Sequence, residues 1–483
     1  DREERPDIDQ IYINAAQLIS GSAGWPLNAF ALPDGKPFYA GTYFPKDQWI
    51  VLLGQVREAY ETEKEAIITQ ANALTEGIGT FEVIEGPARD SSGLDKENLG
   101  RFVDELYGSL DFRNGGQRGE PKFPMPAIWE FMLQNYFLTA DQKSLDIVTI
   151  TLDKIASGAI YDHIGGGFAR YSTDSAWKVP HFEKMLYDNA QLVSLYSHAY
   201  QVTRNPLYLE VVHETLAFVK RELTNEQGAF YSSVNADSEG IEGKFYIWTK
   251  DEMIKVLGSP MATRMADYYN VSDSGNWEEG KNILYRDIRD DAFASGIGIT
   301  VEAWKQVLAS GKKKLLQARN KRVRPSTDDK AITSWNALML IGYLDAYRAT
   351  ADKGYLDEAL KSATFLQKHM HRKDGSLWRS YSRGKGGIHA FLDDYALLAR
   401  AYINLYQVTL EKRWLDQARF LADYAIKHFR DETTGMFYYT SEGAEDLVVR
   451  MMETSDQVIP SSNSVMSEVL LLLGDYYQDT TFS

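Results

Sequence analysis

The sequence predicts a small α/β segment at the N-terminus, followed by an all-α ring of helical hairpins. One observation is a pattern of polar pair, small residue and apolar helix, which recurs three times with nearly constant spacing. A fixed period marks stacked units that share a core. The other is a helical pattern followed by two strand patterns within the first 43 residues.

The repeat is anchored on Ala190, Ala337 and Ala396. Eighteen residues after each comes an aromatic–leucine pair, and a glycine-aromatic segment follows twenty-three or twenty-four residues further on. The first helix of each unit is apolar on most sides, which is typical of a buried helix, whereas the second is amphipathic. We therefore expect an inner and an outer ring of helices, with chain reversals carrying short strands at one end.

Composition excludes several classes of protein. A length of 483 residues is too great for one compact core, and a net charge of −16 argues against general nucleic-acid binding. No apolar run reaches membrane-spanning length, so no membrane partner is expected. Cysteine is absent, which is compatible with a cytoplasmic protein. No compact metal or nucleotide motif is present, so we expect neither metal nor cofactor, and the sequence gives no oligomeric state.

The N-terminal segment reads in order as helix, strand, turn and strand. Ile8–Leu18 has helical periodicity, and Pro33–Lys36 is a turn signal between strand patterns at Leu27–Leu32 and Pro37–Ala40. A helix and a two-stranded hairpin cannot bury a stable core alone. We therefore expect the remaining strands of this domain to lie upstream of residue 1.

Three motifs in this segment, Asp1–Asp7, Gly24–Asn28 and Gly41–Pro45, resemble the spermatogenesis-associated, thioredoxin-domain-containing protein family. The resemblance implies a thioredoxin-like N-terminal domain in which Pro26 is the cis proline facing the redox motif. It also implies that the family's cysteine-containing motif lies before residue 1, so redox chemistry cannot be assigned to these residues.

Further motifs that resemble the same family follow in its order along nearly the whole chain. They are Lys122–Pro126, Pro180–Asp188, Ala236–Gly240 with Gly243–Tyr246, Asp328–Lys330 with Ser334–Asn336, and Ile459–Ser464. The resemblance implies that the second domain is an (α/α)6-type toroid, similar to six-hairpin glycosidases and N-acylglucosamine 2-epimerases. This agrees with the repeat, although one fold hosts many chemistries.

Between these parts, Trp49–Ile78 is predicted to be one long helix, and the acidic stretch Glu82–Ser92 a connector. We place the domain boundary there, with residues 1–85 belonging to the thioredoxin-like part and 86–483 to the toroid. The repeat is broken at about 250–325, which indicates an insertion over one end of the ring. We expect the chain to stop within a further hairpin that begins near Asn463.

The strongest candidate site is the segment from Arg170 to Asp188, because polar residues at the mouth of a helical ring are natural site residues. Pro180 suits the first position of a helix, which would put His181 and Glu183 in its first turn. His181 can act as a general acid or base, because its ordinary pKa lies near neutrality.

Glu183 and Asp188 are the partner carboxylates of this candidate site, and Arg170 and Tyr171 its candidate substrate-binding residues. A structural alternative stays open. Lys184 and Asp188 are spaced to form an ion pair on a helix, and Glu183 can simply complement a helix dipole.

Other candidates stand before the later inner helices. Two carboxylates on a loop can act as acid and base, and an aspartate ahead of a tryptophan can accompany a stacking surface for sugar. The alternatives are a turn, a helix cap and a core tryptophan. The residues concerned are Asp237, Glu239 and Asp329 as catalytic candidates, and Trp335, Asn336 and Asp394 as substrate-binding candidates.

Two hypotheses for function remain. In one, the toroid binds or modifies a sugar or glycan, by hydrolysis with a pair of carboxylates or by epimerisation with a proton-shuttling histidine. In the other, the toroid is a non-catalytic or redox-linked scaffold whose active motif lies upstream of residue 1. Convergence of the candidates at one place would favour the first hypothesis, and their scatter as isolated helix caps the second.

Overall fold

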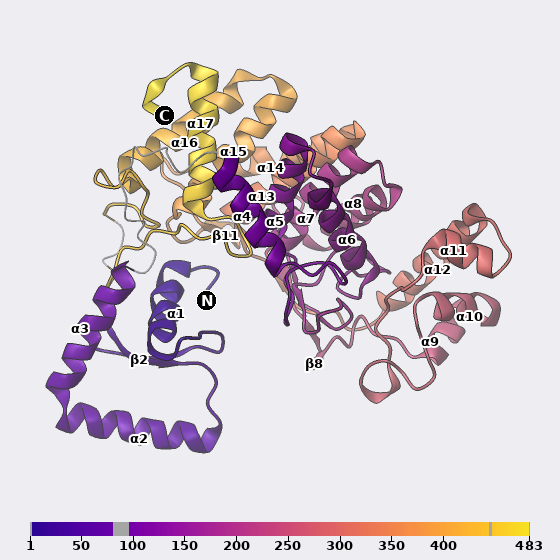
Figure 1. Cartoon of the computed structure of the whole chain (residues 1–483), viewed down its shortest axis with the longest axis horizontal. Helices are drawn as coiled ribbons and strands as arrows, with labels where there is room; N and C mark the ends of the chain where they lie inside the picture. Colours follow the sequence, from indigo (N-terminus) through magenta and orange to yellow (C-terminus); the bar gives the residue numbers. More distant parts are fainter. Residues whose placement is uncertain (1, 81–95, 444–446, 483) are drawn as a thin grey trace.

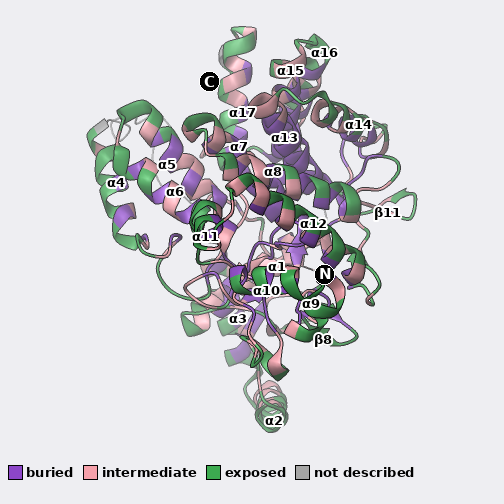
Figure 2. Ribbon diagram, turned by 90° about the vertical axis from the view of Figure 1, so that its right-hand side faces the viewer, coloured by how far each residue is buried: buried purple, intermediate pink, exposed green. Residues whose placement is uncertain are grey.

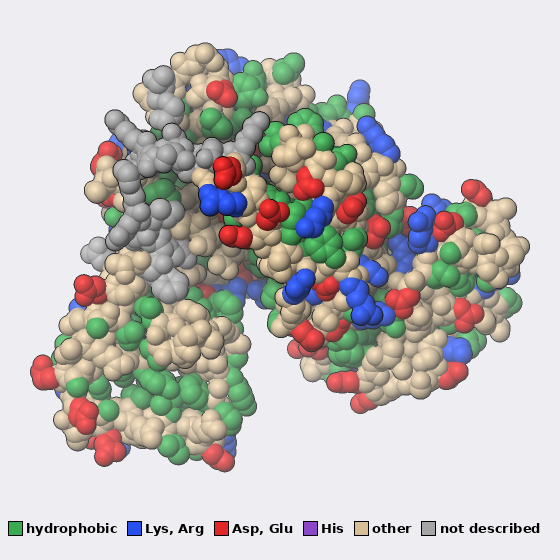
Figure 3. All heavy atoms as spheres, viewed as in Figure 1, with side chains coloured by type: hydrophobic (Ala, Val, Ile, Leu, Met, Phe, Trp, Pro, Cys, Tyr) green, Lys and Arg blue, Asp and Glu red, His purple; other side chains and the backbone are tan. Residues whose placement is uncertain are grey.

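The computed structural model describes residues 2–80, 96–443 and 447–482. Figure 1 shows a ring of helices with two smaller parts below it, an N-terminal part with α1 to α3 and a lobe with α9 to α12. In Figure 3 these two parts stand on either side of an open gap beneath the ring. The predicted boundary near residue 85 lies outside the described residues. Within those ranges, no helix combines the length and apolar character needed to cross a membrane.

The N-terminal part confirms the predicted helix and hairpin. Its elements are α1 (Pro6–Ser20), β1 (Asn28–Ala31), β2 (Pro37–Gly41), α2 (Lys46–Thr62) and α3 (Lys64–Thr80). The strands pair antiparallel, and α1 and α3 pack on β2 around a small core that includes Ile11, Ala40 and Ile78. The peptide bond between Trp25 and Pro26 is cis, as the resemblance implied.

The prediction of one long helix over Trp49–Ile78 is wrong. The helix breaks at Glu63, whose φ of −128° and ψ of 36° leave the helical region. The break allows α2 and α3 to pack against different residues. Trp49 on α2 stacks on Phe30 of the hairpin at 5.7 Å between ring centroids, while α3 buries Ile67 and Ala71. A continuous helix could not make both contacts.

The ring confirms the predicted toroid of helical hairpins. Each pair joins an inner to an outer helix: α5 (Pro126–Thr139) with α6 (Gln142–Ser157), α7 (Leu186–Thr203) with α8 (Pro206–Phe218), α13 (Thr333–Thr350) with α14 (Lys353–His369), and α15 (Leu392–Thr409) with α16 (Lys412–Phe429). Helix α4 (Lys96–Ser109) precedes them, and α17 (Ser462–Tyr477) packs beside α15. The inner helix α13 is buried along most of its length, as Figure 2 shows, because apolar residues cover all its sides.

A buried asparagine explains much of the repeat. The Asn189 side chain accepts a hydrogen bond from the Phe168 N–H and donates to the Phe168 carbonyl, so it clamps the preceding glycine-aromatic segment. Asn336 clamps Phe230 in the same way, and Asn463 clamps Phe437. In α7, α13 and α17 the start of the helix is thereby fixed to the preceding chain reversal, whereas in α15 Tyr395 stands at this position and its hydroxyl accepts the Leu377 N–H.

Short strands gather where the inner helices begin, which we call the mouth of the ring. They pair as β3 (Tyr171–Ser172) with β4 (Pro180–His181); β5 (Lys184–Met185), β6 (Ser233–Val234) and β9 (Thr327–Asp328); β7 (Asp237–Ser238) with β8 (Ile241–Glu242); and β10 (Ala331–Ile332), β11 (Ser380–Ser382) and β12 (Lys385–Gly386). The predicted strands at one end of the ring are thus present.

The insertion forms a lobe with its own apolar core. Its helices are α9 (Lys250–Leu257), α10 (Ser259–Tyr268), α11 (Asp290–Gly296) and α12 (Val301–Arg319). The lobe lies beside the ring rather than over its end, since Lys312 of α12 pairs with Glu214 of α8 at 2.8 Å. Buried Asp162 fastens it further, because this carboxylate binds both Arg319 and Lys184, at 2.9 and 2.8 Å.

Candidate functional site

The candidate segment from Arg170 to Asp188 contains three short strands before helix α7, and the prediction that Pro180 opens a helix is wrong. Pro180 and His181 form β4, which pairs with β3, and helix α7 begins only at Leu186. The Arg170 N–H donates to the Glu183 carbonyl at 2.8 Å. These backbone bonds bring the side chains of Arg170, His181 and Glu183 together at the mouth.

A charged chain of contacts runs through these side chains. Arg170 Nη1 lies 3.1 Å from Glu183 Oε2, and His181 Nε2 lies 3.7 Å from the same oxygen. On its other side, His181 Nδ1 lies 2.7 Å from Glu242 Oε1. The Tyr171 ring stacks on the imidazole at 4.9 Å. Four of the predicted site residues, Arg170, Tyr171, His181 and Glu183, therefore meet in one cluster.

Opposite charges shift the pKa values in this cluster. The contact with Glu183 and the charge of Glu242 raise the pKa of His181, against the effect of burial. Burial opposes ionisation of Glu183, but the contacts with His181 and Arg170 lower its pKa overall. The geometry therefore favours a cationic imidazole between two carboxylates.

Asp188 stands in a different environment in the first turn of α7. It is buried, and burial raises its pKa well above the ordinary value, helped by the charges of Glu183 and Glu3 and opposed by Arg170. The alternative in which Asp188 pairs with Lys184 is wrong, because the Lys184 ammonium binds Asp162 and the Gly166 carbonyl. Asp188 is thus a carboxyl group favoured in its protonated form beside an ionised one.

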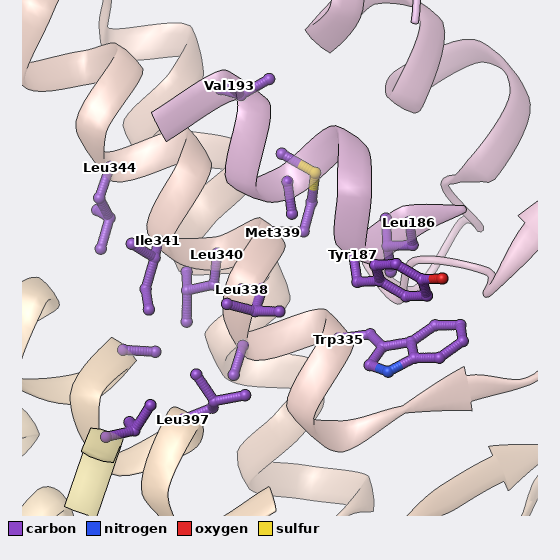
Figure 4. Packing of buried hydrophobic residues seen from close by; sticks show 14 of the residues in the cluster. Leu186, Tyr187, Val193, Trp335, Leu338, Met339, Leu340, Ile341, Leu344 and Leu397 are labelled. Carbon is purple, nitrogen blue, oxygen red and sulfur yellow. The ribbon is translucent and has the colours of Figure 1, made fainter. Parts of the chain in front are cut away.

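Aromatic rings close the inner side of the cluster. The Tyr187 and Trp335 rings lie edge to face, with centroids 4.8 Å apart, as Figure 4 shows. Trp335 is only 2% exposed, so it is a core residue and not the open stacking surface that was expected. Burial also raises the pKa of the Tyr187 hydroxyl well above its usual value.

Several buried polar atoms at the mouth have no hydrogen-bond partner within the described ranges. Most buried polar groups in proteins are paired, so such atoms are uncommon. They belong to the residue before β3 and to the first turns of α7, α13 and α17: Arg170 Nε, Tyr187 Oη, Asp188 Oδ2, Ser334 Oγ and Ser462 Oγ. A ligand rich in hydroxyl groups offers both donors and acceptors to such a set.

Two predicted substrate-binding residues have structural roles instead. The Asn336 amide is buried and bonded to the backbone of Phe230 and Ile332. Asp394 is also buried, and it accepts hydrogen bonds from the Ser334 and Phe391 N–H groups and from Arg379. Both side chains are buried and held by groups of the protein.

The remaining predicted residues lie at the rim. Asp237 and Glu239 are exposed on the β7–β8 hairpin, and Glu239 pairs with Lys244 at 2.8 Å. Asp329 is exposed and lies 3.4 Å from Ser382 Oγ. The hairpin reaches the cluster through Glu242, which sequence reasoning missed because it lies 61 residues from His181. In the described part of the chain no group of three or more histidine, aspartate or glutamate side chains is placed to hold a metal ion.

Comparison with known proteins identifies the family. A family model described as "Protein of unknown function, DUF255" (Thioredox_DsbH) matches residues 1–79. The chain is 34% identical to human spermatogenesis-associated protein 20, over 98% of this chain and 66% of that protein. It is 33% identical to the Caenorhabditis elegans uncharacterized protein B0495.5, over 98% of this chain and 70% of that protein. The chain belongs to the family of spermatogenesis-associated protein 20. It spans about two thirds of the length of its human relative.

The chain was also compared with solved structures, and its similarity to them is low in both sequence and geometry. The chain matches an α-mannanase of glycoside hydrolase family 76 from Bacteroides thetaiotaomicron with a TM-score of 0.48 and 11% identity, over 81% of this chain and 82% of that one. It matches cellobiose 2-epimerase from Bacillus thermoamylovorans with a TM-score of 0.35 and 16% identity, over 77% and 98%. Likeness at this level carries no argument about function.

Proposed function

We propose that the toroid hydrolyses a glycosidic bond with Asp188 as general acid and Glu183 as the second carboxylate. The observation that carries the proposal is the contrast between two carboxyl groups five residues apart in the chain. Glu183 lies 3.1 Å from Arg170 and its pKa is lowered, whereas Asp188 is buried without an ion-pair partner in the described ranges and its pKa is raised. Carboxyl groups whose environments separate their pKa values in this way divide into acid and base. Asp188 Oδ2 is also buried and without a partner in the described ranges, and a hydroxyl group of a bound ligand would satisfy it.

In the proposed reaction, the Asp188 proton passes to the leaving glycosidic oxygen as the bond from this oxygen to the anomeric carbon breaks. Ionised Glu183 either activates the attacking water or attacks the anomeric carbon before water completes hydrolysis. Arg170, bonded to Glu183 at 3.1 Å, keeps that carboxyl group ionised. The unpartnered Arg170 Nε and Tyr187 Oη would bind sugar hydroxyls.

Epimerisation with His181 as the base is less consistent with these contacts. A base must be unprotonated, whereas Glu183 and Glu242 raise the pKa of His181 and favour the imidazolium ion. His181 is better suited to hold Glu183 in place. The scaffold hypothesis, in turn, leaves the unpartnered buried atoms at the mouth without an explanation.

The test is thermal unfolding and hydrolysis with a panel of mono- and oligosaccharides that includes N-acylated amino sugars. A ligand at a hundred times its dissociation constant adds about 2.7 kcal/mol, which should raise the midpoint by several degrees. Asp188→Asn should keep the fold and lower hydrolysis by about 10²–10⁴-fold. Asp237→Asn, an exposed aspartate outside the cluster, is the matched control.

Two results would count against the proposal. Flat unfolding curves across the panel would favour the scaffold hypothesis. Hydrolysis that persists in Asp188→Asn at the level of Asp237→Asn would remove Asp188 from the reaction.

A further inference from the structure

The motif Lys122–Pro126, which has no part in the proposed reaction, lies beside the cluster of Arg170, Tyr171, His181 and Glu183. Lys122 and Ser172 exchange two backbone hydrogen bonds, at 2.8 and 2.9 Å. Ser172 belongs to β3, whose other partner is β4 with His181. The motif therefore lies along the edge of β3 and continues the wall of the mouth.

A row of three aromatic rings leads from this motif into the cluster. The Phe123 and Tyr171 rings have centroids 4.9 Å apart and planes inclined at 31°. Tyr171 in turn stacks on the His181 imidazole, also at 4.9 Å. Phe123 is the outer member of the row and is only partly buried. Two ring-to-ring steps thus connect it to the histidine that contacts Glu183.

A cavity of about 220 Å³ lies beside Phe123. Phe123 and Met125 give it apolar surface, and Ser109, Gln117 and Arg118 give it polar groups. Small-molecule sites commonly combine an aromatic and apolar lining with a few polar groups. The row of rings places this cavity next to the candidate cluster.

The polar side chains of the cavity are partly held by the backbone and keep donors available. Arg118 Nε donates to the Leu110 carbonyl at 3.0 Å, which ties the arginine to the end of α4. Within the described ranges, no hydrogen bond or ion pair engages the two Nη groups of Arg118 or the Gln117 amide. These groups can donate to the hydroxyls of a ligand.

The loop that carries these groups is firmly packed. The Lys122 ammonium is buried and binds the Asp111 carboxylate and the Gly115 carbonyl, each at 2.7 Å. Gly116 lies so close to the Trp177 ring that a Cβ atom there would be 2.6 Å from it. The cavity is therefore formed before a ligand binds, which lowers the cost of ordering the site on binding.

We propose that this cavity is a second sugar subsite of the toroid's site, so that the substrate is an oligosaccharide of at least two units. This inference rests on the proposed function, because it names the ligand class of the same site. The C–H face of a pyranose ring packs on the Phe123 ring, and its hydroxyls accept from Arg118 and Gln117. The neighbouring unit of the same chain lies at Asp188. A monosaccharide fills only one of the two places.

The experiment measures calorimetric binding of glucose, mannose and N-acetylglucosamine, each beside its own disaccharide and trisaccharide. The proteins are the wild type, Phe123→Ala and Phe137→Ala. Phe137→Ala is the matched control, because Phe137 is 84% exposed near the other end of α5. The wild type should bind a disaccharide more tightly than its monosaccharide. Phe123→Ala should weaken disaccharide binding by about tenfold and leave monosaccharide binding unchanged, and Phe137→Ala should change neither.

A second variant, Arg118→Gln, tests the cavity without removing a packed ring. Arg118 is exposed, so the fold should tolerate the change. Loss of its hydrogen bonds to the second sugar should weaken disaccharide binding by about fivefold. Arg113→Gln is the control, because Arg113 is an exposed arginine of the same loop that does not line the cavity.

The outcomes separate this inference from the proposed function. Equal affinity for mono- and disaccharides, or equal losses of both in Phe123→Ala and Arg118→Gln, would overturn the subsite and leave the proposed hydrolysis intact. Disaccharide binding that depends on Phe123 and Arg118, without any hydrolysis, would support the subsite and overturn the proposed reaction. Absence of binding in all three sugar series would overturn both proposals.

Discussion

Asp188 and Asp394 occupy the same position in the repeat, two residues before the small residue of an inner helix, yet their surroundings differ. Both are buried in the first turn of their helices. Asp394 accepts two backbone N–H groups and an arginine, whereas Asp188 Oδ2 has no partner in the described ranges. One position of the repeat therefore serves as a structural cap in one unit and as a candidate reactive group in another. The hydrogen-bond partners of the aspartate, and not its residue type, decide which of these two roles it has.

The largest expected effect is on stability. Asp394→Ala would leave the Ser334 and Phe391 N–H groups unpaired and take one of two carboxylates from buried Arg379. Breaking a buried ion pair of this kind costs about 3–5 kcal/mol. We expect the thermal unfolding midpoint to fall by several degrees.

Asp188→Asn is the matched substitution in the other unit, and it should leave the midpoint unchanged or higher. Asparagine keeps the shape of the side chain. It also removes a carboxyl group whose ionised form is destabilised by burial. Equal losses in the two variants would show that Asp188 is a structural cap too, and the contrast between the units would disappear.

The second prediction concerns the pH dependence of the same contrast. The folded-state pKa of Asp188 is raised above its ordinary value of 3.8. A carboxyl group with a raised pKa binds its proton more tightly in the folded state. Its contribution to stability is therefore complete below the unfolded pKa and is lost as pH rises toward the folded pKa. Asp188→Asn should thus gain on the wild type by up to about 1.4 kcal/mol per pH unit above pH 4.

Unfolding midpoints of the two proteins from pH 4 to pH 8 provide the measurement. Asp237→Asn makes the same substitution at an exposed site and serves as control. Parallel curves for the wild type and Asp188→Asn would mean that Asp188 is ionised in the folded protein. Asp188 could not then act as the acid.

The ring was predictable from the sequence because its signal is periodic and local. Inner helices that are apolar on all sides, joined at constant spacing, leave few alternative arrangements. The recurrence of asparagine at positions 189, 336 and 463 is also a structural signal, which the sequence analysis did not use. An asparagine that recurs near the start of several inner helices indicates a role in the fold, and the Asn336 amide binds backbone groups of Phe230 and Ile332.

The site was predictable only where its residues are neighbours in sequence. Arg170, His181 and Glu183 lie within one segment, although Pro180 and His181 form a strand instead of the expected start of a helix. That error arose because the pairing of β3 with β4 is a tertiary contact, which local propensity does not report. Glu242 reaches the cluster through the β7–β8 hairpin, and no sequence pattern links it to His181, which lies 61 residues away in the chain.

The smallest expected effect concerns His181, which separates hydrolysis from epimerisation. Glu242→Gln removes one of the two carboxylates that face the imidazole, so the pKa of His181 should fall. Because Glu242 is half exposed, solvent screens the interaction and the fall should be less than about one pKa unit. Proton NMR titration of the imidazole resonances measures it, and eight histidines in the chain keep the spectrum tractable.

Glu239→Gln is the control for this titration, because Glu239 lies on the same β7–β8 hairpin but pairs with Lys244. Its histidine titrations should match those of the wild type. The absolute pKa of His181 in the wild type is as informative as the shift. A value above the ordinary 6.5 leaves the imidazole cationic near neutrality, with Glu183 as the base of the site. A value below it would give a free imidazole base, and proton abstraction from a sugar would then replace hydrolysis as the better proposal.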